Sequence, residues 1–143
     1  MTENAQNNPH LTALGAVVES IGGGRARMRL PFSANLVGDA ETDILHGGVL
    51  TALLDNVGGS ATFSALPPGT VIATLDLRID YMRPAQTGRE IVAEAHCYRK
   101  TRNVAFVRGV AFHEDTDDPV ATMAATFMIA SNQTRDAAEA TAP

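Results

Sequence analysis

Hydrophobic residues recur along most of the chain with the period of β-strands, and only one long stretch follows the period of an α-helix. Alternating or β-branched runs predict strands at 15–21, 25–30, 71–81, 91–99, 104–113 and 120–129. Between residues 47 and 66, apolar side chains recur every three or four positions without a proline, which predicts one long helix. A helical turn is expected at 10–14, and the acidic segment 31–45 is expected to be irregular.

Turn residues separate these elements in a way that favours an antiparallel sheet. Three glycines at 22–24 predict a hairpin turn, and the polar links at 100–103 and 114–119 are as short as antiparallel hairpins require. The Pro-Pro-Gly segment at 67–69 ends the helix. The sequence therefore predicts an α+β fold in which a sheet of five or six strands packs on one central helix.

The predicted helix has two unequal faces. Its apolar stripe consists of Leu50, Leu53, Leu54, Val57 and Ala61. The opposite face carries small residues in place of charges, namely Gly48, Thr51, Ala52, Gly59 and Thr62. From 47 to 66 the only ionisable side chain is that of Asp55. This pattern is typical of a helix covered by a second layer, which we expect to be a partner subunit; the alternative is an exposed Asp55 on a poorly amphipathic helix.

His46, Gly47 and Gly48 stand at the start of this helix, where the first backbone amides lack acceptors within the helix and attract negative charge. The separation of Gly47 from Asp55 corresponds to about 12 Å along a helix. One chain therefore cannot bring both groups to the same carbonyl. Two antiparallel helices related by a two-fold axis would place the amide end of one beside Asp55 of the other, as an oxyanion site next to a carboxylate.

The composition is that of a globular protein of 143 residues, 45% hydrophobic and 19% charged, with a formal net charge of -5. We expect a single domain over 10–130 and disordered tails at 1–9 and 131–143. The acidic balance argues against nucleic-acid binding, and the lack of a signal peptide or membrane-spanning run favours a cytoplasmic protein without membrane contact. The single cysteine, Cys97, permits no disulfide within the chain and is expected to be a small buried strand residue.

Several kinds of chemistry find no support in the sequence. The four histidines lack the spacing of a metal site, and neither a metal nor another cofactor is expected. No serine lies in a nucleophile elbow, and neither a dinucleotide fingerprint nor a phosphate loop is present. Arg25, Arg27 and Arg29 alternate along one strand as a solvated face does, although they could also meet an anionic ligand. What remains is a carboxylate acting with backbone amides, which suits hydrolysis at an acyl carbon.

Three features together resemble a known family: the segment LHGGVLTALLDN at 45–56, the strand TLDLRIDYMRPA at 74–85 and the β-rich C-terminal half. They are similar to the hotdog-fold acyl-CoA thioesterases of the PaaI-like, phenylacetate-pathway type, over roughly residues 11–129. The resemblance implies a curved antiparallel sheet wrapped around the central helix, and a homodimer whose sheets join, often paired into a homotetramer. It also implies hydrolysis of an acyl-CoA thioester to free acid and CoA.

The resemblance assigns roles to single residues. Asp55 matches the family's catalytic carboxylate, and the Gly47 N–H matches the donor that polarises the thioester carbonyl from the other subunit. His46 matches the motif histidine, which we expect to fix the start of the helix more than to transfer protons. Thr74 occupies the position at which some relatives orient the attacking water with a Ser or Thr, although a threonine on a strand needs no such role.

One position departs from the family pattern. Several relatives carry an Asn six positions before the motif histidine, where this chain has Ala40. Asn35 and Asp43 are the nearby residues that could replace it. Gly48 and Asn56 are further candidates for contact with the substrate.

The phosphates of CoA require cations in spite of the acidic net charge. The densest basic cluster lies on a predicted hairpin turn and comprises Arg99, Lys100 and Arg102, with Arg83 and Arg89 as other options. A solvated turn explains each of these residues taken singly.

The sequence thus favours a thioester hydrolase in which Asp55 either activates water or attacks the carbonyl directly. Phe63, Leu66 and Tyr81 are expected to shape the pocket for the acyl group. The alternatives are a non-catalytic acyl-CoA binding module of the same fold and a hydratase acting on enoyl-CoA.

Overall fold

The computed structural model describes residues 7–130. Its elements are α2 (Pro9–Leu14), β1 (Val17–Gly22), β2 (Arg25–Leu30), the 3₁₀ turn η1 (Ala34–Leu36), β3 (Val37–Asp39), β4 (Ile44–Leu45), α3 (Gly47–Ser64), β5 (Ile72–Tyr81), β6 (Ile91–Lys100), β7 (Val104–Phe112) and β8 (Ala121–Ile129). The predicted long helix and six strands are all present. Residues 1–6 and 131–143, most of the expected tails, lie outside the described residues, whereas Pro9 of the expected N-terminal tail begins α2.

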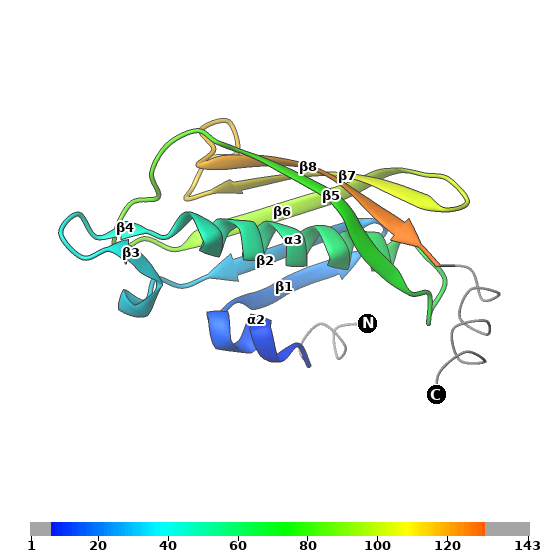
Figure 1. The fold of residues 1–143 in the computed structure, drawn as a ribbon, viewed down its shortest axis with the longest axis horizontal. Helices are drawn as coiled ribbons and strands as arrows, with labels where there is room; N and C mark the ends of the chain where they lie inside the picture. The colour runs from blue at the N-terminus through cyan, green and yellow to red at the C-terminus, as the bar shows by residue number, and fades with distance from the viewer. Residues whose placement is uncertain (1–6, 131–143) are drawn as a thin grey trace.

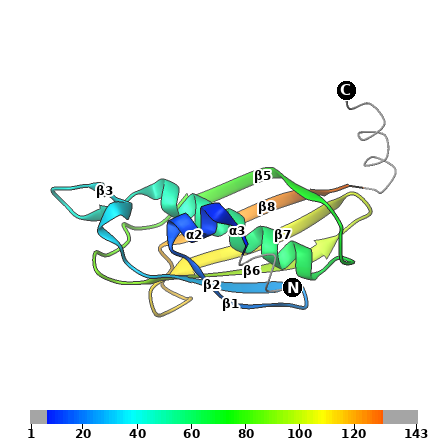
Figure 2. The same cartoon turned by 90° about the horizontal axis from the view of Figure 1, so that it is seen from below.

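Six strands form one antiparallel sheet in the order β1-β2-β6-β7-β8-β5. The sheet curves around α3, and α2 lies beneath α3 near the β1 edge (Figures 1 and 2). The predicted α+β arrangement of a curved sheet on one central helix is therefore confirmed. The segment 31–45 is less irregular than predicted, because β3 and β4 pair there as a separate two-stranded hairpin that delivers the chain to His46.

The apolar stripe of α3 packs against the inner face of the sheet as predicted. Leu53, Leu54, Val57 and Ala61 are fully buried, and Leu50 is nearly so. The prediction that Thr62 lies on the opposite, outward face is wrong. Thr62 is fully buried, and its hydroxyl donates a hydrogen bond of 2.9 Å to the Gly58 carbonyl one turn earlier, so the backbone of the helix satisfies the buried polar group.

The edge strand β5 contains a β-bulge that changes which side chains face α3. Strict alternation along this strand places Leu75 on the apolar face and Thr74 on the polar face with Asp76. In the structure the pairing with β8 shifts between Thr74 and Asp76, so Leu75 is an extra residue in the ladder. Thr74 consequently lies on the inner face and contacts α3, whereas Leu75 is 57% exposed. The face that strict alternation predicts for Thr74 is wrong, because the bulge adds one residue to the strand and nothing in the hydrophobic pattern of the sequence reveals it.

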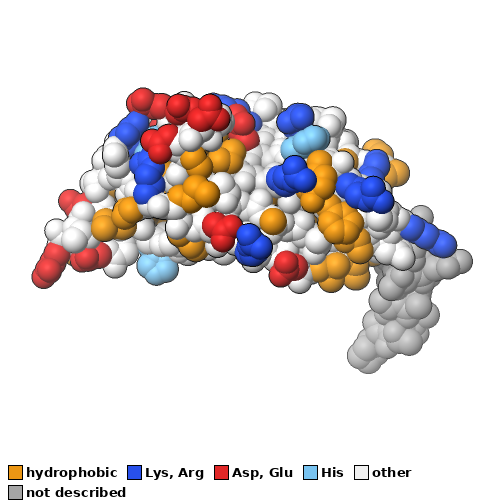
Figure 3. Space-filling model, turned by 90° about the horizontal axis from the view of Figure 1, so that it is seen from above, with side chains coloured by type: hydrophobic (Ala, Val, Ile, Leu, Met, Phe, Trp, Pro, Cys, Tyr) orange, Lys and Arg blue, Asp and Glu red, His pale blue; other side chains and the backbone are white. Residues whose placement is uncertain are grey.

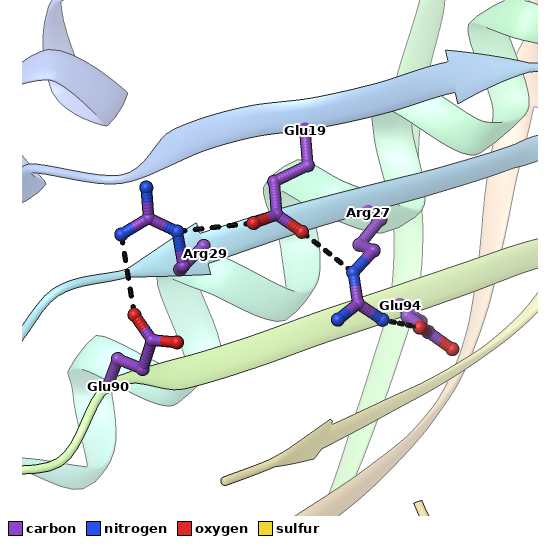
Figure 4. Close-up of polar contacts among 5 residues, drawn as sticks. All are labelled: Glu19, Arg27, Arg29, Glu90 and Glu94. Atoms are coloured by element: carbon purple, nitrogen blue, oxygen red, sulfur yellow. Dashed lines mark hydrogen bonds and ion pairs between the residues drawn. The ribbon is translucent and has the colours of Figure 1, made fainter. Parts of the chain in front are cut away.

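An ion-pair network covers the outer face of β1, β2 and β6 (Figure 4). Arg27 binds Glu19 at 2.7 Å and also contacts Glu94, and Arg29 binds Glu19 at 3.1 Å and Glu90 at 3.3 Å. The hydrogen bond from Arg27 is the main reason why the pKa of Glu19 lies below its ordinary value. Arg27 and Arg29 are therefore engaged by carboxylates of their own chain, which favours the interpretation of this strand as a solvated face.

Candidate active site

The start of α3 is fixed by the side chain of His46. His46 is the N-cap residue, and its Nδ1 accepts a hydrogen bond of 2.9 Å from the Gly48 N–H. The Val49 N–H donates to the His46 carbonyl at 3.0 Å. Within residues 7–130, no acceptor is bonded to the Gly47 N–H. The cap thus occupies the amides that follow Gly47 and leaves the Gly47 N–H, at the positive end of the helix dipole, available to an oxyanion.

The two glycines of the motif differ in how much room a side chain would have at each position. A Cβ atom on Gly48 would stand 2.9 Å from Nδ1 of His46, so any larger residue would displace the capping ring. For a Cβ atom on Gly47 the nearest atoms would be those of the Tyr81 side chain, at 3.5 Å or more, which is an ordinary contact. Packing within the chain therefore requires glycine at 48 but not at 47, where a Cβ atom would make only ordinary van der Waals contact.

Tyr81, at the end of β5, contacts the first turn of α3. Its hydroxyl donates to the Gly47 carbonyl at 3.1 Å and lies 2.5 Å from Oγ1 of Thr51. The sequence predicted only that Tyr81 shapes the pocket, because an aromatic residue at the end of a strand does not reveal a hydrogen bond to a helix 34 positions away. Tyr81 and Thr51 together hold the peptide that follows the free Gly47 N–H.

Asp55 lies two turns further along α3 and is half-buried. Thr74 donates a hydrogen bond from Oγ1 to Oδ1 of Asp55 at 2.9 Å, across the space between α3 and β5. The contact exists because the bulge turns Thr74 toward the helix. It fixes one carboxylate oxygen, and within residues 7–130 the other oxygen has no hydrogen-bond partner, which suits a carboxylate that acts as a base or nucleophile.

A pocket of about 660 Å³ opens beside this pair, between α3, β5 and the loop that follows α3. Asp55 and Thr74 line it together with apolar side chains from three elements, among them Phe63, Ile72 and Phe127. Of the three residues predicted to shape the pocket, Phe63 lines it and is 50% exposed, whereas Leu66 and Tyr81 are not among the lining residues. A carboxylate within an apolar pocket of this size is a typical small-molecule site.

Asn8 and Asn56 form a polar part of the pocket wall. The sequence predicted Asn56 as a site residue but not Asn8. The Asn8 Nδ2 donates to Oδ1 of Asn56 at 2.9 Å, and both residues line the pocket. Asn8 falls in the predicted disordered tail, and a contact between positions 48 residues apart leaves no local signal in the sequence. The structure thus supports the prediction that Asn56 lies at the site and adds Asn8 to it.

The predicted phosphate-binding residues differ in their surroundings. Arg83 donates to the carbonyl and carboxylate of Asp118 at 3.0 and 3.2 Å, so it is engaged within its own chain. Lys100 contacts the Ala65 carbonyl, which brings the β6–β7 hairpin to the C-terminal end of α3 (Figure 1). Arg99 and Arg102 on this hairpin are exposed, and no ion pair to them is present within residues 7–130. On the outer face, acidic side chains gather toward one end, and basic and apolar side chains are interspersed toward the other (Figure 3).

Asn35 and Asp43, the candidates to replace the Asn that relatives carry at the position of Ala40, do not line the pocket. Asn35 accepts a hydrogen bond from Ser33 at 2.5 Å and is exposed. The backbone of Asp43 bonds Asp39 and Thr87, and its φ of 53° marks a tight turn between β3 and β4. Neither side chain is hydrogen-bonded to His46 or Asp55 within the part of the chain that the structure describes.

Other groups of interest lie outside the pocket. Burial is the main reason why the pKa of the half-buried Cys97 thiol is raised, which favours the protonated form over the reactive thiolate. Among residues 7–130, no group of three or more His, Cys, Asp or Glu side chains could hold a metal ion. No helix of the described chain is long and apolar enough to cross a membrane.

A single long helix wrapped by one curved antiparallel sheet is the hotdog fold, and it defines the class of this protein. Residues 42–120 match the thioesterase superfamily. Because the match extends over more than half of the 143 residues, the chain belongs to the thioesterase superfamily, a family of thioester hydrolases.

Similar proteins carry names that agree with this family. A proposed esterase of Halobacterium salinarum is 39% identical over 93 residues, which are 62% of this chain and 60% of that protein. The chain therefore matches less than two thirds of that relative. The medium/long-chain acyl-CoA thioesterase YigI of Escherichia coli is 30% identical over 134 residues, 85% of each chain.

Solved structures show the same fold. A protein of Pseudomonas aeruginosa is 38% identical, with a TM-score of 0.78 over 88% of this chain and 96% of that one. A mutant of the phenylacetic acid degradation protein PaaI from Thermus thermophilus is 28% identical, with a TM-score of 0.74 over 85% of this chain and 98% of that one. The predicted hotdog fold and the PaaI-like thioesterase family are confirmed.

Proposed function

We propose that this protein hydrolyses acyl-CoA or similar thioesters to the free acid and the thiol. The observation that carries the proposal is the position of Asp55, the only ionisable residue of α3, in a largely apolar pocket with one oxygen held by Thr74. The second element is the Gly47 N–H, which the His46 cap leaves free. A carboxylate and a free helix-terminal amide are the two groups that hydrolysis of a thioester needs.

The two groups would act from different subunits. α3 is continuous from Gly47 to Ser64, so Gly47 and Asp55 are about 12 Å apart within one chain. If two copies of α3 lie antiparallel with Gly47 of one beside the partner's Asp55, the two-fold axis passes next to Thr51, midway between them. Thr51 lies on the same face of the helix as both groups, as this arrangement requires. Each dimer would then contain two identical sites.

The free edge of the sheet supports a dimer of this kind. β5 is a ten-residue strand at the edge of the sheet, and an edge of this length is rarely left open to solvent. Apolar side chains in and beside it are strongly exposed in the single chain: Val71 at 47%, Leu75 at 57% and Met82 at 57%. Pairing of β5 with its copy would join the two sheets and cover these residues, and two such dimers could associate further into a tetramer.

The proposed reaction begins with the thioester carbonyl oxygen at the Gly47 N–H, which stabilises the negative charge that develops there. Asp55 of the partner subunit either removes a proton from the attacking water or attacks the carbonyl carbon itself. In the first route the C–S bond then breaks and the proton passes from Asp55 to the leaving thiolate. In the second, attack by Asp55 breaks the C–S bond and expels the thiolate, and water then hydrolyses the mixed anhydride to the free acid and the Asp55 carboxylate and supplies the proton of the thiol. In both routes Thr74 orients the Asp55 carboxylate.

The substrate class rests on the relatives and on the pocket. YigI is named a medium/long-chain acyl-CoA thioesterase, and the apolar wall formed by Phe63, Ile72 and Phe127 is compatible with an acyl chain. The exposed Arg99 and Arg102 stand on the hairpin next to the C-terminal end of α3, where they could bind the phosphates of CoA. We include Lys100 in this cluster. Arg83 is the weakest candidate, because it forms an ion pair with Asp118.

The experiment that tests the proposal compares Asp55→Asn with Asp117→Asn, an exposed carboxylate in the turn between β7 and β8, as the matched control. With a panel of aliphatic and aryl CoA thioesters, we expect kcat of the Asp55 variant to fall roughly 10²–10⁴-fold and the control to keep full activity. Unchanged turnover in the Asp55 variant would contradict the proposal. Binding without turnover in the wild type would identify an acyl-CoA binding protein, and loss of enoyl absorbance would identify a hydratase.

A further inference from the structure

A directional chain of hydrogen bonds connects the N-terminal helix to the turn of α3 that carries Asp55. The backbone N–H groups of His10 and Leu11 both donate to Oδ1 of Asn8, each at 3.1 Å. Nδ2 of Asn8 donates to Oδ1 of Asn56 at 2.9 Å, and Nδ2 of Asn56 donates to the Ala52 carbonyl at 2.8 Å. The chain thus begins at backbone donors and ends at a backbone acceptor.

These ends determine the orientation of both carboxamides. Oδ1 of Asn8 must be the oxygen, because two N–H groups point at it, and the Ala52 carbonyl can only accept, so it must face the nitrogen of Asn56. Each carboxamide nitrogen carries two hydrogens and uses one of them within residues 7–130. Both residues line the pocket next to Asp55. The wall therefore offers N–H donors that the described chain does not itself satisfy.

Capping of α2 does not by itself explain Asn8. A Ser or Asp at this position would accept the same two backbone hydrogen bonds, since these residues cap helices as well as Asn does. Leu11 already anchors α2, because its side chain is 4% exposed in the core. Among the residues that commonly cap helices, only Asn carries both an acceptor for the cap and an N–H donor for Asn56.

We propose that Asn56 is a substrate-binding residue that donates a hydrogen bond to a carbonyl or hydroxyl oxygen of the bound thioester, and that Asn8 is the positioning residue that orients it. This inference rests on the proposed function and extends it by a ligand contact from the N-terminal segment. The oxygen belongs either to a substituent on the acyl group or to an amide of the pantetheine arm. Both sources present the same acceptor to Asn56.

The test uses Asn8→Ser, which keeps the helix cap and removes the donor to Asn56. Thr12→Ala is the matched control, because Thr12 lies in the same helix and its hydroxyl donates to the Asn8 carbonyl at 3.1 Å, away from the pocket. We expect Asn8→Ser to raise KM roughly threefold to tenfold with little change in kcat, which corresponds to one neutral hydrogen bond. The double variant Asn8→Ser/Asn56→Ser should behave like Asn56→Ser alone, because both changes remove the same contact.

A panel of thioesters identifies the source of the oxygen. If a pantetheine amide accepts the bond, KM rises for every CoA thioester but not for the ethanethiol thioesters of the same acids. If an acyl substituent accepts it, KM rises only for hydroxyacyl or oxoacyl thioesters, whichever thiol they carry. An Asn8→Ser enzyme that matches Thr12→Ala across the whole panel overturns the inference, and so does an equal rise in KM for ethanethiol thioesters of unsubstituted acids.

Failure of the proposed function would be visible separately. In that case the wild type hydrolyses none of the thioesters, and binding of CoA and of a non-hydrolysable thioether analogue of a hydroxyacyl-CoA, measured by calorimetry, replaces KM as the readout. A threefold to tenfold weaker binding in Asn8→Ser would still support the contact. Equal affinity of Asn8→Ser and wild type for both ligands would overturn it.

Discussion

Thr74 on β5 donates a hydrogen bond to Asp55 on α3 at a distance of 2.9 Å. The contact depends on the bulge at Leu75, which turns Thr74 to the inner face of the sheet. It joins the edge strand to the carboxylate that we place at the centre of the reaction. The geometry of the site is therefore set by an irregularity of the strand as much as by the helix.

Replacement of Thr74 tests this relationship. Thr74→Val keeps the shape of the side chain and removes the donor, so kcat should fall about 10-fold to 100-fold, the value of one hydrogen bond to a charged group. Thr74→Ser keeps the hydroxyl and should retain most of the activity. Thr126→Val, on the outer face of the neighbouring strand, is the control. Full activity in Thr74→Val, measured in steady-state assays, would show that Thr74 is only a strand residue.

The two motif glycines should respond differently to alanine. In Gly48→Ala the new Cβ displaces the His46 ring and the cap is lost, so the free energy of unfolding should fall by about 1–3 kcal/mol. In Gly47→Ala the Cβ fits against Tyr81, so stability should stay near that of the wild type. Activity should fall, because the new methyl group stands beside the N–H that we propose binds the thioester oxygen. Chemical denaturation and steady-state assays of both variants check this. A stable, fully active Gly48→Ala enzyme would contradict the role that we assign to His46.

The ion-pair network on the outer face should give the protein a defined acid dependence. The pKa of Glu19 is lowered in the folded state, chiefly by the hydrogen bond from Arg27, so the unfolded chain binds more protons as the pH falls. The stabilisation by Glu19 is present above its unfolded pKa and is lost as the pH falls through its folded pKa. Each exposed pair contributes about 0.2–1 kcal/mol.

Glu19→Gln should therefore be less stable than the wild type at neutral pH, and the difference should shrink on acidification below the ordinary pKa of a glutamate. Urea denaturation at a series of pH values and low salt measures it. Glu114→Gln, which removes the partner of the isolated pair with Arg89, is a control outside the network. A difference between wild type and Glu19→Gln that is independent of pH would contradict this explanation.

Much of the fold follows from periodicity. The stripe from Leu50 to Ala61 repeats at helical spacing and packs on the sheet as predicted, and the strands were found because apolar residues alternate between short polar links. Asp55 was found because no other ionisable residue lies in that helix, and Gly47 because two glycines after a histidine open it. These signals are local, and for that reason one sequence reveals them.

The features that the sequence did not reveal depend on contacts between distant segments. The resemblance named Thr74 as a site residue, but the alternation placed it on the outer face, because a bulge interrupts the alternation without changing the residue types. Asn8 was assigned to a tail because its partner, Asn56, is 48 positions away. Thr62 was placed outward because its hydroxyl bond to Gly58 lets a polar residue be buried. In each case the position of the residue depends on its neighbours in the folded protein, which the residue types alone do not reveal.

The central claim is that one site combines Gly47 of one chain with Asp55 of another, and heterodimers of inactive variants test it directly. Asp55→Asn removes the carboxylate. Gly47→Pro removes the N–H donor without a change of backbone conformation, because proline is accepted at the first position of a helix and His46 before it is already extended, with a ψ of 130°. Two affinity tags on co-expressed chains isolate each heterodimer.

A heterodimer that carries Asp55→Asn on one chain and Gly47→Pro on the other has one intact shared site of two, so its kcat should be about half that of the wild type. A heterodimer of the wild type with the double variant has no intact shared site and should be inactive. If each site lies within one chain, the results are reversed: the first heterodimer is inactive and the second keeps about half of the activity. That reversal would contradict the proposed mechanism.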